Sequence, residues 1–208
     1  MNDSAALAHQ DLPTADLAAG LTVLASARWP ASSADVLPSI PGFVLSSFSP
    51  LVAELAERCL RWYFGERPAD PARGTHTAVL LASTSGDLAT AAAVAGAVDA
   101  GRRVPPLLFY QSNPNAIVGH LTARWGLAGP VVCTSPAAAA LPDALRGAAR
   151  LIEDGDAAAV LVIVAEQEQP RGGQDRGTAL LLGPRSWPPP AGATAAPPGA
   201  ARSHSSGG

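Results

Sequence analysis

The sequence predicts an α/β fold, and three observations predict it. Between Gln111 and Glu166 the chain reads as a turn, a helix, a strand, a second helix and a second strand in unbroken succession. The second of these strands, residues 157–165, is a run of apolar residues, which is typical of a parallel strand buried on both faces. Small residues fill the sharp turn between the first strand and the helix that follows, an arrangement that can hold a chemical group at a helix N-terminus.

Proline and glycine set the bounds of these elements. Asn113-Pro114 marks the entry to the first helix, because the residue before a proline is disfavoured in helical conformation. Gly126 ends that helix, residues 131–134 form a short strand, and a second helix spans about 137–153. Gly155 follows it, because glycine adopts the left-handed conformation that closes a helix. The apolar positions of the first helix are Ile117, Leu121 and Trp125.

The N-terminal part of the chain supplies further strands and helices. Residues 21–27 alternate in a strand-like pattern, and Ser49 followed by Pro50 predicts a helix start, with serine as the capping residue. Residues 77–82 form a short apolar strand. Ser85-Gly86-Asp87 then precedes an alanine-rich helix that extends to about Asp99, and we interpret this turn as a helix cap, because no phosphate-binding motif surrounds it. A last strand spans residues 177–183.

Composition narrows the class of protein. A chain of 208 residues predicts one domain of moderate size, and a net charge of -3 without a basic run argues against nucleic acid as the main partner. Charged residues make up 15% and hydrophobic residues 48%, which indicates a buried interface. No window predicts a membrane span, and the start lacks a secretory pattern. Cys59 and Cys133 lie far apart, so we expect a reducing cytoplasmic location and a buried, unreactive Cys59.

The chain divides into three parts. We expect a flexible leader at residues 1–19, one domain at 20–185, and a disordered tail rich in Pro, Ala, Gly and Ser at 186–208. The tail has too few large apolar residues to order a backbone.

A string of short motifs in the central segment resembles the β-ketoacyl synthase (thiolase-like) family. The motifs are Pro114-Asn115, Gly119-His120, the turn Gly126–Pro130 and the strand that follows. The resemblance covers about residues 20–184 and implies the N-terminal half of a thiolase-like fold, a mixed five-stranded sheet with helices on its faces. It also implies that the absent half would expose a large apolar face.

The same resemblance locates the position of the family's reactive cysteine. In the family that cysteine lies nine residues after the glycine of Gly-Pro and seventeen before the glycine that closes the next helix. Counting from Gly129 and from Gly155 gives Ala138 both times. A methyl group cannot form a thioester, so the resemblance implies a subunit that is not an enzyme.

Chain length factors are the members of this family that lack the cysteine and pair with an active ketosynthase. The chain is similar to the short type of highly reducing type II polyketide and aryl polyene systems. This implies a full-length ketosynthase as partner, in a heterodimer or a dimer of heterodimers, an acyl carrier protein as transient partner, and neither cofactor nor metal. The implied acyl-tunnel or interface residues are Phe109, Tyr110, Gln111 and Asn113, and the implied partner-pairing strand is Val131, Val132, Cys133 and Thr134.

Three alternatives stay open. Cys133 with His120 could serve a small acyltransferase or hydrolase, although Cys133 lies inside the predicted strand and His120 fits a structural role better. The chain could be a scaffold or carrier-protein docking module without a tunnel. Phe109 and Tyr110 could fill a hydrophobic core.

Overall fold

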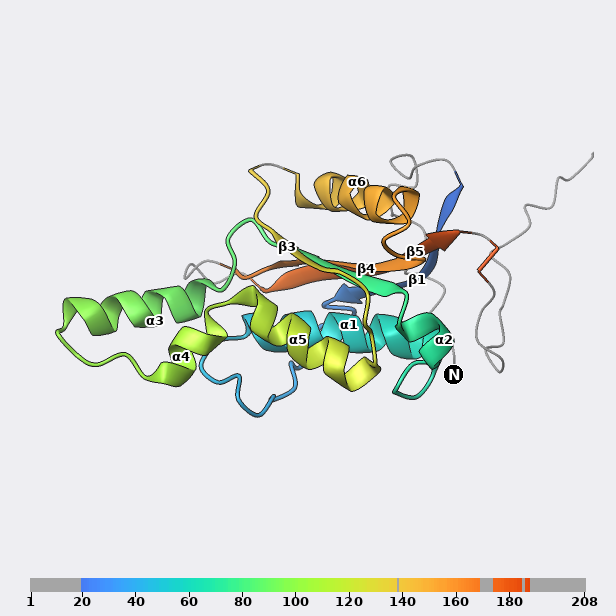
Figure 1. Ribbon diagram of the computed structural model, residues 1–208. Coiled ribbons are helices and arrows are strands. Elements are labelled where there is room, and N and C mark those ends of the chain that lie inside the picture. The colour runs from blue at the N-terminus through green and yellow to red at the C-terminus, as the bar shows by residue number, and fades with distance from the viewer. Residues whose placement is uncertain (1–19, 138, 169–173, 185, 188–208) are drawn as a thin grey trace, which may run out of the picture.

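The computed structural model describes residues 20–137, 139–168, 174–184 and 186–187. A mixed five-stranded sheet forms the middle layer, with α6 on one face and α1 and α5 on the other (Figure 1). The strands are β1 (Leu21–Trp29), β2 (Thr77–Ala82), β3 (Val131–Thr134), β4 (Ala159–Glu166) and β5 (Arg176–Pro184). The helices are α1 (Phe48–Phe64), α2 (Pro71–Gly74), α3 (Leu88–Asp99), α4 (Pro106–Gln111), α5 (Pro114–Trp125) and α6 (Ala140–Glu153).

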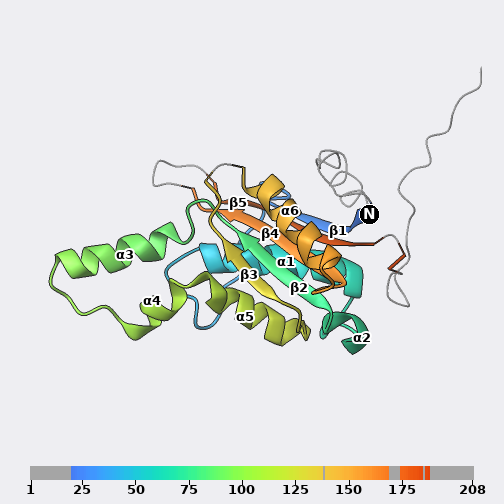
Figure 2. The ribbon, with the colours of Figure 1, turned by 45° about the horizontal axis from the view of Figure 1, so that its top comes forward.

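The strands follow the order β1-β5-β4-β2-β3 (Figure 2). The pairs β2–β4 and β2–β3 are parallel, whereas β4–β5 and β1–β5 are antiparallel. The α/β class and the mixed five-stranded sheet predicted from the sequence are therefore confirmed. Strands β1 and β3 are the two edges of this sheet, and β3 is the edge that leads into α6.

The core lies on both faces of the sheet because nearly all residues of the central strands β2 and β4 are apolar. All six residues of β2 are buried, as are most of those of β4. One core cluster joins the sheet to α1 and α5 and includes Leu51, Ile117 and Trp125. The other joins the opposite face to α6 through Leu145 and Ala148.

Two predicted helix starts were wrong by a few residues. Helix α6 begins at Ala140 rather than near residue 137, which puts Pro142 in its first turn. A helix from 137 would need the backbone N–H that Pro142 lacks. Helix α1 begins at Phe48, before Pro50, and Ser49 is therefore inside the helix rather than its cap.

Helices α3 and α4 extend away from the sheet at one end of the molecule (Figure 1), and we call these two helices and their connection, residues 88–111, the arm. The short helix α4 was not predicted. The alanine-rich α3 has only Thr90 and Ala97 buried, and its first charged residue is Asp99. The turn before it caps the helix as predicted, because the carboxylate of Asp87 accepts from the backbone N–H of Thr90 at 2.9 Å.

The outward face of α6 is charged. Its buried residues face the sheet, while Asp143, Arg146, Arg150 and Glu153 are exposed. Asp143 and Arg146 form an ion pair along the helix. The exposed large apolar residues lie elsewhere, and those on the arm are Val98, Leu107, Phe109 and Tyr110.

No helix among the described residues is long and apolar enough to cross a membrane. Within the same residues, no group of three or more His, Cys, Asp or Glu side chains is arranged to hold a metal ion. The predicted leader 1–19 and most of the predicted tail 186–208 lie outside the described residues.

Candidate functional site

The connection from β3 to α6 is where the sequence predicts the lost nucleophile. Ala138 itself lies outside the described residues, but both flanks are described. On the strand side the hydroxyl of Ser135 donates to the carbonyl oxygen of Thr84 at 3.1 Å. On the helix side Ala139 is the N-cap of α6 and offers no side-chain hydrogen bond. The described flanks thus carry no thiol.

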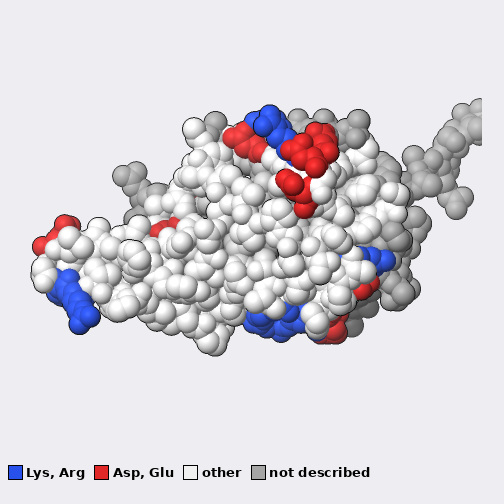
Figure 3. Space-filling model, in the orientation of Figure 1, with Lys and Arg blue, Asp and Glu red and all other residues white. Residues whose placement is uncertain are grey.

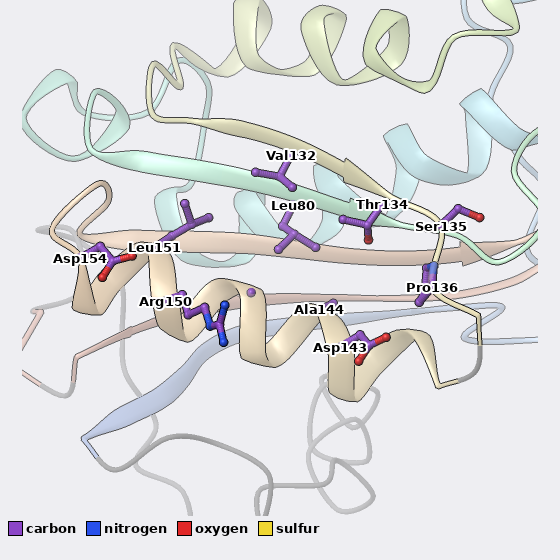
Figure 4. A pocket seen from close by; sticks show the side chains of 11 residues that line it. Leu80, Val132, Thr134, Ser135, Pro136, Asp143, Ala144, Arg150, Leu151 and Asp154 are labelled. Carbon is purple, nitrogen blue, oxygen red and sulfur yellow. The ribbon is translucent and has the colours of Figure 1, made fainter.

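A groove of about 320 Å³ runs between β3 and α6 (Figure 4). It exists because α6 packs over β2 and β4 and leaves that face of β3 uncovered. Gly147 sets the helix close to the sheet, since an added Cβ there would lie 2.9 Å from Leu80 Cδ1. Leu80, Val132 and Leu151 line the groove with apolar groups, and Asp143, Arg150 and Asp154 add charged ones.

The free edge of β3 offers backbone hydrogen-bonding groups to another strand. The carbonyl oxygens of Pro130 and Thr134 accept from Val79 and Ser83 on the β2 side. Because alternate residues of a strand direct their backbone groups to opposite sides, Val131 and Cys133 direct theirs away from β2. The side chain of Val131 is also exposed. An unpaired edge of this kind is a template for pairing with another chain.

Cys133 lies within β3, as predicted, and its thiol is not activated. The side chain is half-buried, and burial raises the pKa of the thiol above its ordinary value. A reactive cysteine needs a lowered pKa. No hydrogen bond joins Cys133 to His120 within the described part of the chain, so the two do not form a nucleophile and base pair.

His120 has structural surroundings. Its ring meets the Phe43 ring edge-on, with the centroids 5.7 Å apart. Burial first, and then the positive charges of Arg124 and Arg67, lower the pKa of His120, so the ring is neutral at pH 7. Cys59 is fully buried in the core as expected, and burial raises the pKa of its thiol to about 12.

Three of the predicted tunnel or interface residues, Phe109, Tyr110 and Gln111, lie in α4 of the arm, and the fourth, Asn113, lies just after it. Phe109 is 77% exposed and Tyr110 57%, so the alternative that they fill this chain's core is wrong. Gln111 is buried, and its side-chain oxygen accepts from the backbone N–H of Val44 at 2.7 Å. Asn113 caps α5 by accepting from Asn115 N at 3.0 Å. A hollow of about 390 Å³ adjoins them, lined by Phe109, Tyr110, Asn113, Asn115, Ala116 and Gly119.

Sequence reasoning missed the polar contacts that hold the base of the arm. The carboxylate of Glu166, at the end of β4, accepts from the backbone N–H groups of Thr84 and Ser85. The next residue, Gln167, accepts from Ala89 N at 3.2 Å and donates to the hydroxyl oxygens of Ser46 and Ser47 at 3.2 and 2.8 Å. No local pattern marks a glutamine whose partners lie 78 to 121 residues away in the chain.

Charge is unevenly distributed over the molecule. In the view of Figure 3, charged side chains gather over α6, at the far end of the arm and along the lower margin. The broad surface between them, which includes the front of β3 in the same orientation, shows few charges. A surface depleted in charge is the compositional mark of an interface core.

Comparison with known proteins extends these observations. Residues 68–182, more than half of the chain, match the family described as Beta-ketoacyl synthase, N-terminal domain. A search of curated protein sequences found no match.

Several solved structures share the fold at low sequence identity. A chain of the complex of the ketosynthase ApeO with its chain length factor ApeC from Xenorhabdus doucetiae is 20% identical with a TM-score of 0.62, and the match covers 79% of each chain. The ishigamide ketosynthase/chain length factor is 20% identical with a TM-score of 0.56, over 72% of this chain and 47% of that one. The type II polyketide complex AntDE:AntF, a ketosynthase with its acyl-carrier protein, is 16% identical with a TM-score of 0.59, over 79% and 62%.

The coverage differs among these relatives. This chain spans about half of the ishigamide relative's chain. The match to the Xenorhabdus complex covers the same share of both chains, so the matched chain is about as long as this one. From residues 68–182 and the shared fold, the chain belongs to the β-ketoacyl synthase family through its N-terminal domain.

Proposed function

We propose that this chain is a non-catalytic, chain-length-factor-type subunit that pairs with an active, full-length ketosynthase. The observation that carries the proposal is the β3-to-α6 connection, where two independent counts put Ala138 at the position of the family's cysteine. A thioester needs a thiol at that position, and alanine has none. The chain's role in polyketide or fatty-acid-like synthesis is then to complete its partner.

The neighbouring groups do not replace the missing thiol. The hydroxyl of Ser135 is engaged with the carbonyl of Thr84, and no base contacts that hydroxyl among the described residues. The thiol of Cys133 is held protonated by burial. These properties support an inactive subunit over an acyltransferase or hydrolase that uses Cys133.

The edge strand β3 supports pairing with another subunit. Val131 and Cys133 direct their backbone groups outward, and a counterpart strand of the ketosynthase would accept and donate these hydrogen bonds in an antiparallel ladder. The low charge of the surrounding surface suits an interface of this kind (Figure 3). A chain of similar length matched within a ketosynthase and chain length factor complex is in line with this proposal.

Phe109 and Tyr110 would contribute to the tunnel that receives the growing acyl chain. Both rings are exposed beside the hollow at α4 and α5, where an apolar ligand or a partner's apolar surface can bury them. An acyl carrier protein would visit the assembled pair to deliver substrate. The alternative of a scaffold without a tunnel predicts the same complex but leaves these two rings without influence on the product.

Co-expression tests the proposal. The chain and the full-length ketosynthase encoded nearest to it should co-purify as one stoichiometric complex that makes product. Neither subunit alone should make product. Substituting the ketosynthase cysteine should abolish product, whereas Cys133→Ala in this chain should leave turnover unchanged. A soluble, separately active form of this chain would contradict the proposal. If the complex forms but Phe109→Ala leaves the product distribution unchanged, the scaffold is the better description.

A further inference from the structure

The segment Phe43–Ser47, just before α1, holds two aliphatic side chains out in solvent on a strained backbone. Leu45 has φ +79°, the left-handed region that glycine adopts freely and leucine rarely does. Its side chain is 64% exposed and that of Val44 is 51% exposed. Leu45 does not stabilise the fold of this chain, since its strained backbone costs free energy and its side chain is not buried. Strained residues of this kind cluster at functional sites.

Contacts on both sides hold this segment in place. The side-chain oxygen of Gln111 accepts from Val44 N at 2.7 Å. On the other side, Gln167 donates to the hydroxyl oxygens of Ser46 and Ser47. The hydroxyl of Ser46 donates to Asp87 at 2.6 Å. The apolar tip, defined as Val44 and Leu45, is therefore fixed before any partner arrives.

The apolar tip is continuous with the exposed aromatic residues of the arm. Phe43, the residue before it, is buried, and its ring lies 6.3 Å from that of Tyr110. The hydrogen bond between Gln111 and Val44 joins the tip to α4 directly. Leu107, Phe109 and Tyr110 of α4 are exposed as well. Together these side chains form a surface of bulky apolar groups, which is the composition of a protein interface core.

We propose that the apolar tip is a preformed contact for the ketosynthase subunit, with Leu45 as its anchor. The inference rests on the proposed function and adds residues that it does not assign. Residues 36–47 carry no charge, so the tip offers nothing to a partner that binds through charge, while continuity with the aromatic residues of α4 directs it to the ketosynthase. A backbone already held in its bound conformation loses little conformational entropy on binding, which is the benefit that offsets the strain.

Leu45→Gly tests the proposal because it separates binding from folding. Glycine relieves the strained backbone, so the melting temperature of the chain should stay level or rise. Its affinity for the ketosynthase, measured by dilution of the co-expressed complex and native mass spectrometry, should fall about tenfold, the loss expected for an interface anchor. Leu45→Asn should weaken binding similarly, because it also removes the apolar side chain. Asparagine tolerates the left-handed conformation, so the fold should be kept.

Val36→Gly is the matched control. Val36 is an 83% exposed aliphatic residue of the same connection, and its removal should not change affinity. If the ketosynthase binds wild type and both Leu45 variants equally, the contact does not exist, while the proposed function stands. If the wild-type chain binds no ketosynthase, both the proposed function and the proposed contact at Leu45 are wrong. If Leu45→Gly instead converts a self-associating chain into monomers, the occupant is a second copy and the proposal is wrong.

Discussion

A proline at position 133 should break the complex and spare the fold, whereas a proline at 132 should destabilise the fold itself. The backbone N–H of Cys133 points away from β2, so its loss removes no bond from the β2–β3 ladder. Val132 is paired with Leu80 and directs its N–H toward β2, and a proline there removes a ladder hydrogen bond. Edge strands accept proline at outward positions.

The structure sets the size of the effect. Val131 and Cys133 each offer one N–H and one C=O outward, so the counterpart strand can form at most about four hydrogen bonds with them, each contributing about 1 kcal/mol. Proline removes one donor, and its ring also enters the space in which a neighbouring strand lies at about 4.8 Å. The expected loss is about 1 to 4 kcal/mol, which corresponds to a dissociation constant about 5- to 1000-fold higher.

The assay combines binding and stability. Analytical ultracentrifugation of the complex with the ketosynthase gives the dissociation constant, and circular dichroism gives the melting temperature. Cys133→Pro should bind weakly and melt close to wild type, and Val132→Pro should melt at a lower temperature. Equal binding by wild type and Cys133→Pro would refute the pairing of β3 with the partner, because a proline at this position removes a hydrogen-bond donor and blocks the neighbouring strand.

Phe109→Ala should leave stability within about 0.5 kcal/mol, because the ring is 77% exposed, and should shift product chain length in the co-expressed complex; an unchanged product by mass spectrometry argues against a tunnel here. The hydrogen bond from Arg58, then that from Ala31 N, holds the pKa of Asp35 at about 2 against an ordinary 3.8. A carboxyl group whose pKa is lowered in the folded chain stabilises the fold at pH values above its pKa in the unfolded chain. Asp35→Asn should therefore lower the melting temperature at pH 7, and the difference from wild type should disappear as the pH falls from about 4 to about 2. A difference in melting temperature that does not depend on pH would show that the ion pair is not its cause. A thiol reagent at pH 8 should label half-buried Cys133 in the native chain and Cys59 only after denaturation; rapid native labelling of Cys59 would show that the core opens.

The sequence predicted most of the sheet because local signals and tertiary structure agree there. The apolar runs at 77–82 and 131–134 coincide with β2 and β3. Gly126 and Gly155 both have positive φ at the ends of their helices, as expected. At these positions the turn chemistry allows few alternatives.

Other features depend on contacts between distant residues, which no local pattern reveals. The predicted start of α6 was wrong because Pro142 lacks the backbone N–H that a helix beginning near residue 137 would need. The family resemblance assigned Gln111 to a tunnel or interface, and only the fold shows that its side chain is buried and bonded to Val44. Hydrophobic periodicity likewise cannot predict the strained backbone of Leu45 or the hydrogen bonds of Gln167.

The charged face of α6 changes what the partner has to cover. The exposed face of this helix carries Asp143, Arg146, Arg150 and Glu153. We therefore expect the ketosynthase to bind at β3, the arm and the apolar tip, and to leave the outer face of α6 in water.

The central claim is that the chain assists a condensing enzyme without carrying the acyl group itself. Intact-protein mass spectrometry of the co-expressed complex, after incubation with an acyl carrier protein loaded with an acyl thioester, tests it most directly. We expect an acyl adduct on the ketosynthase and an unmodified mass for this chain. An acyl group bound covalently to this chain would contradict it.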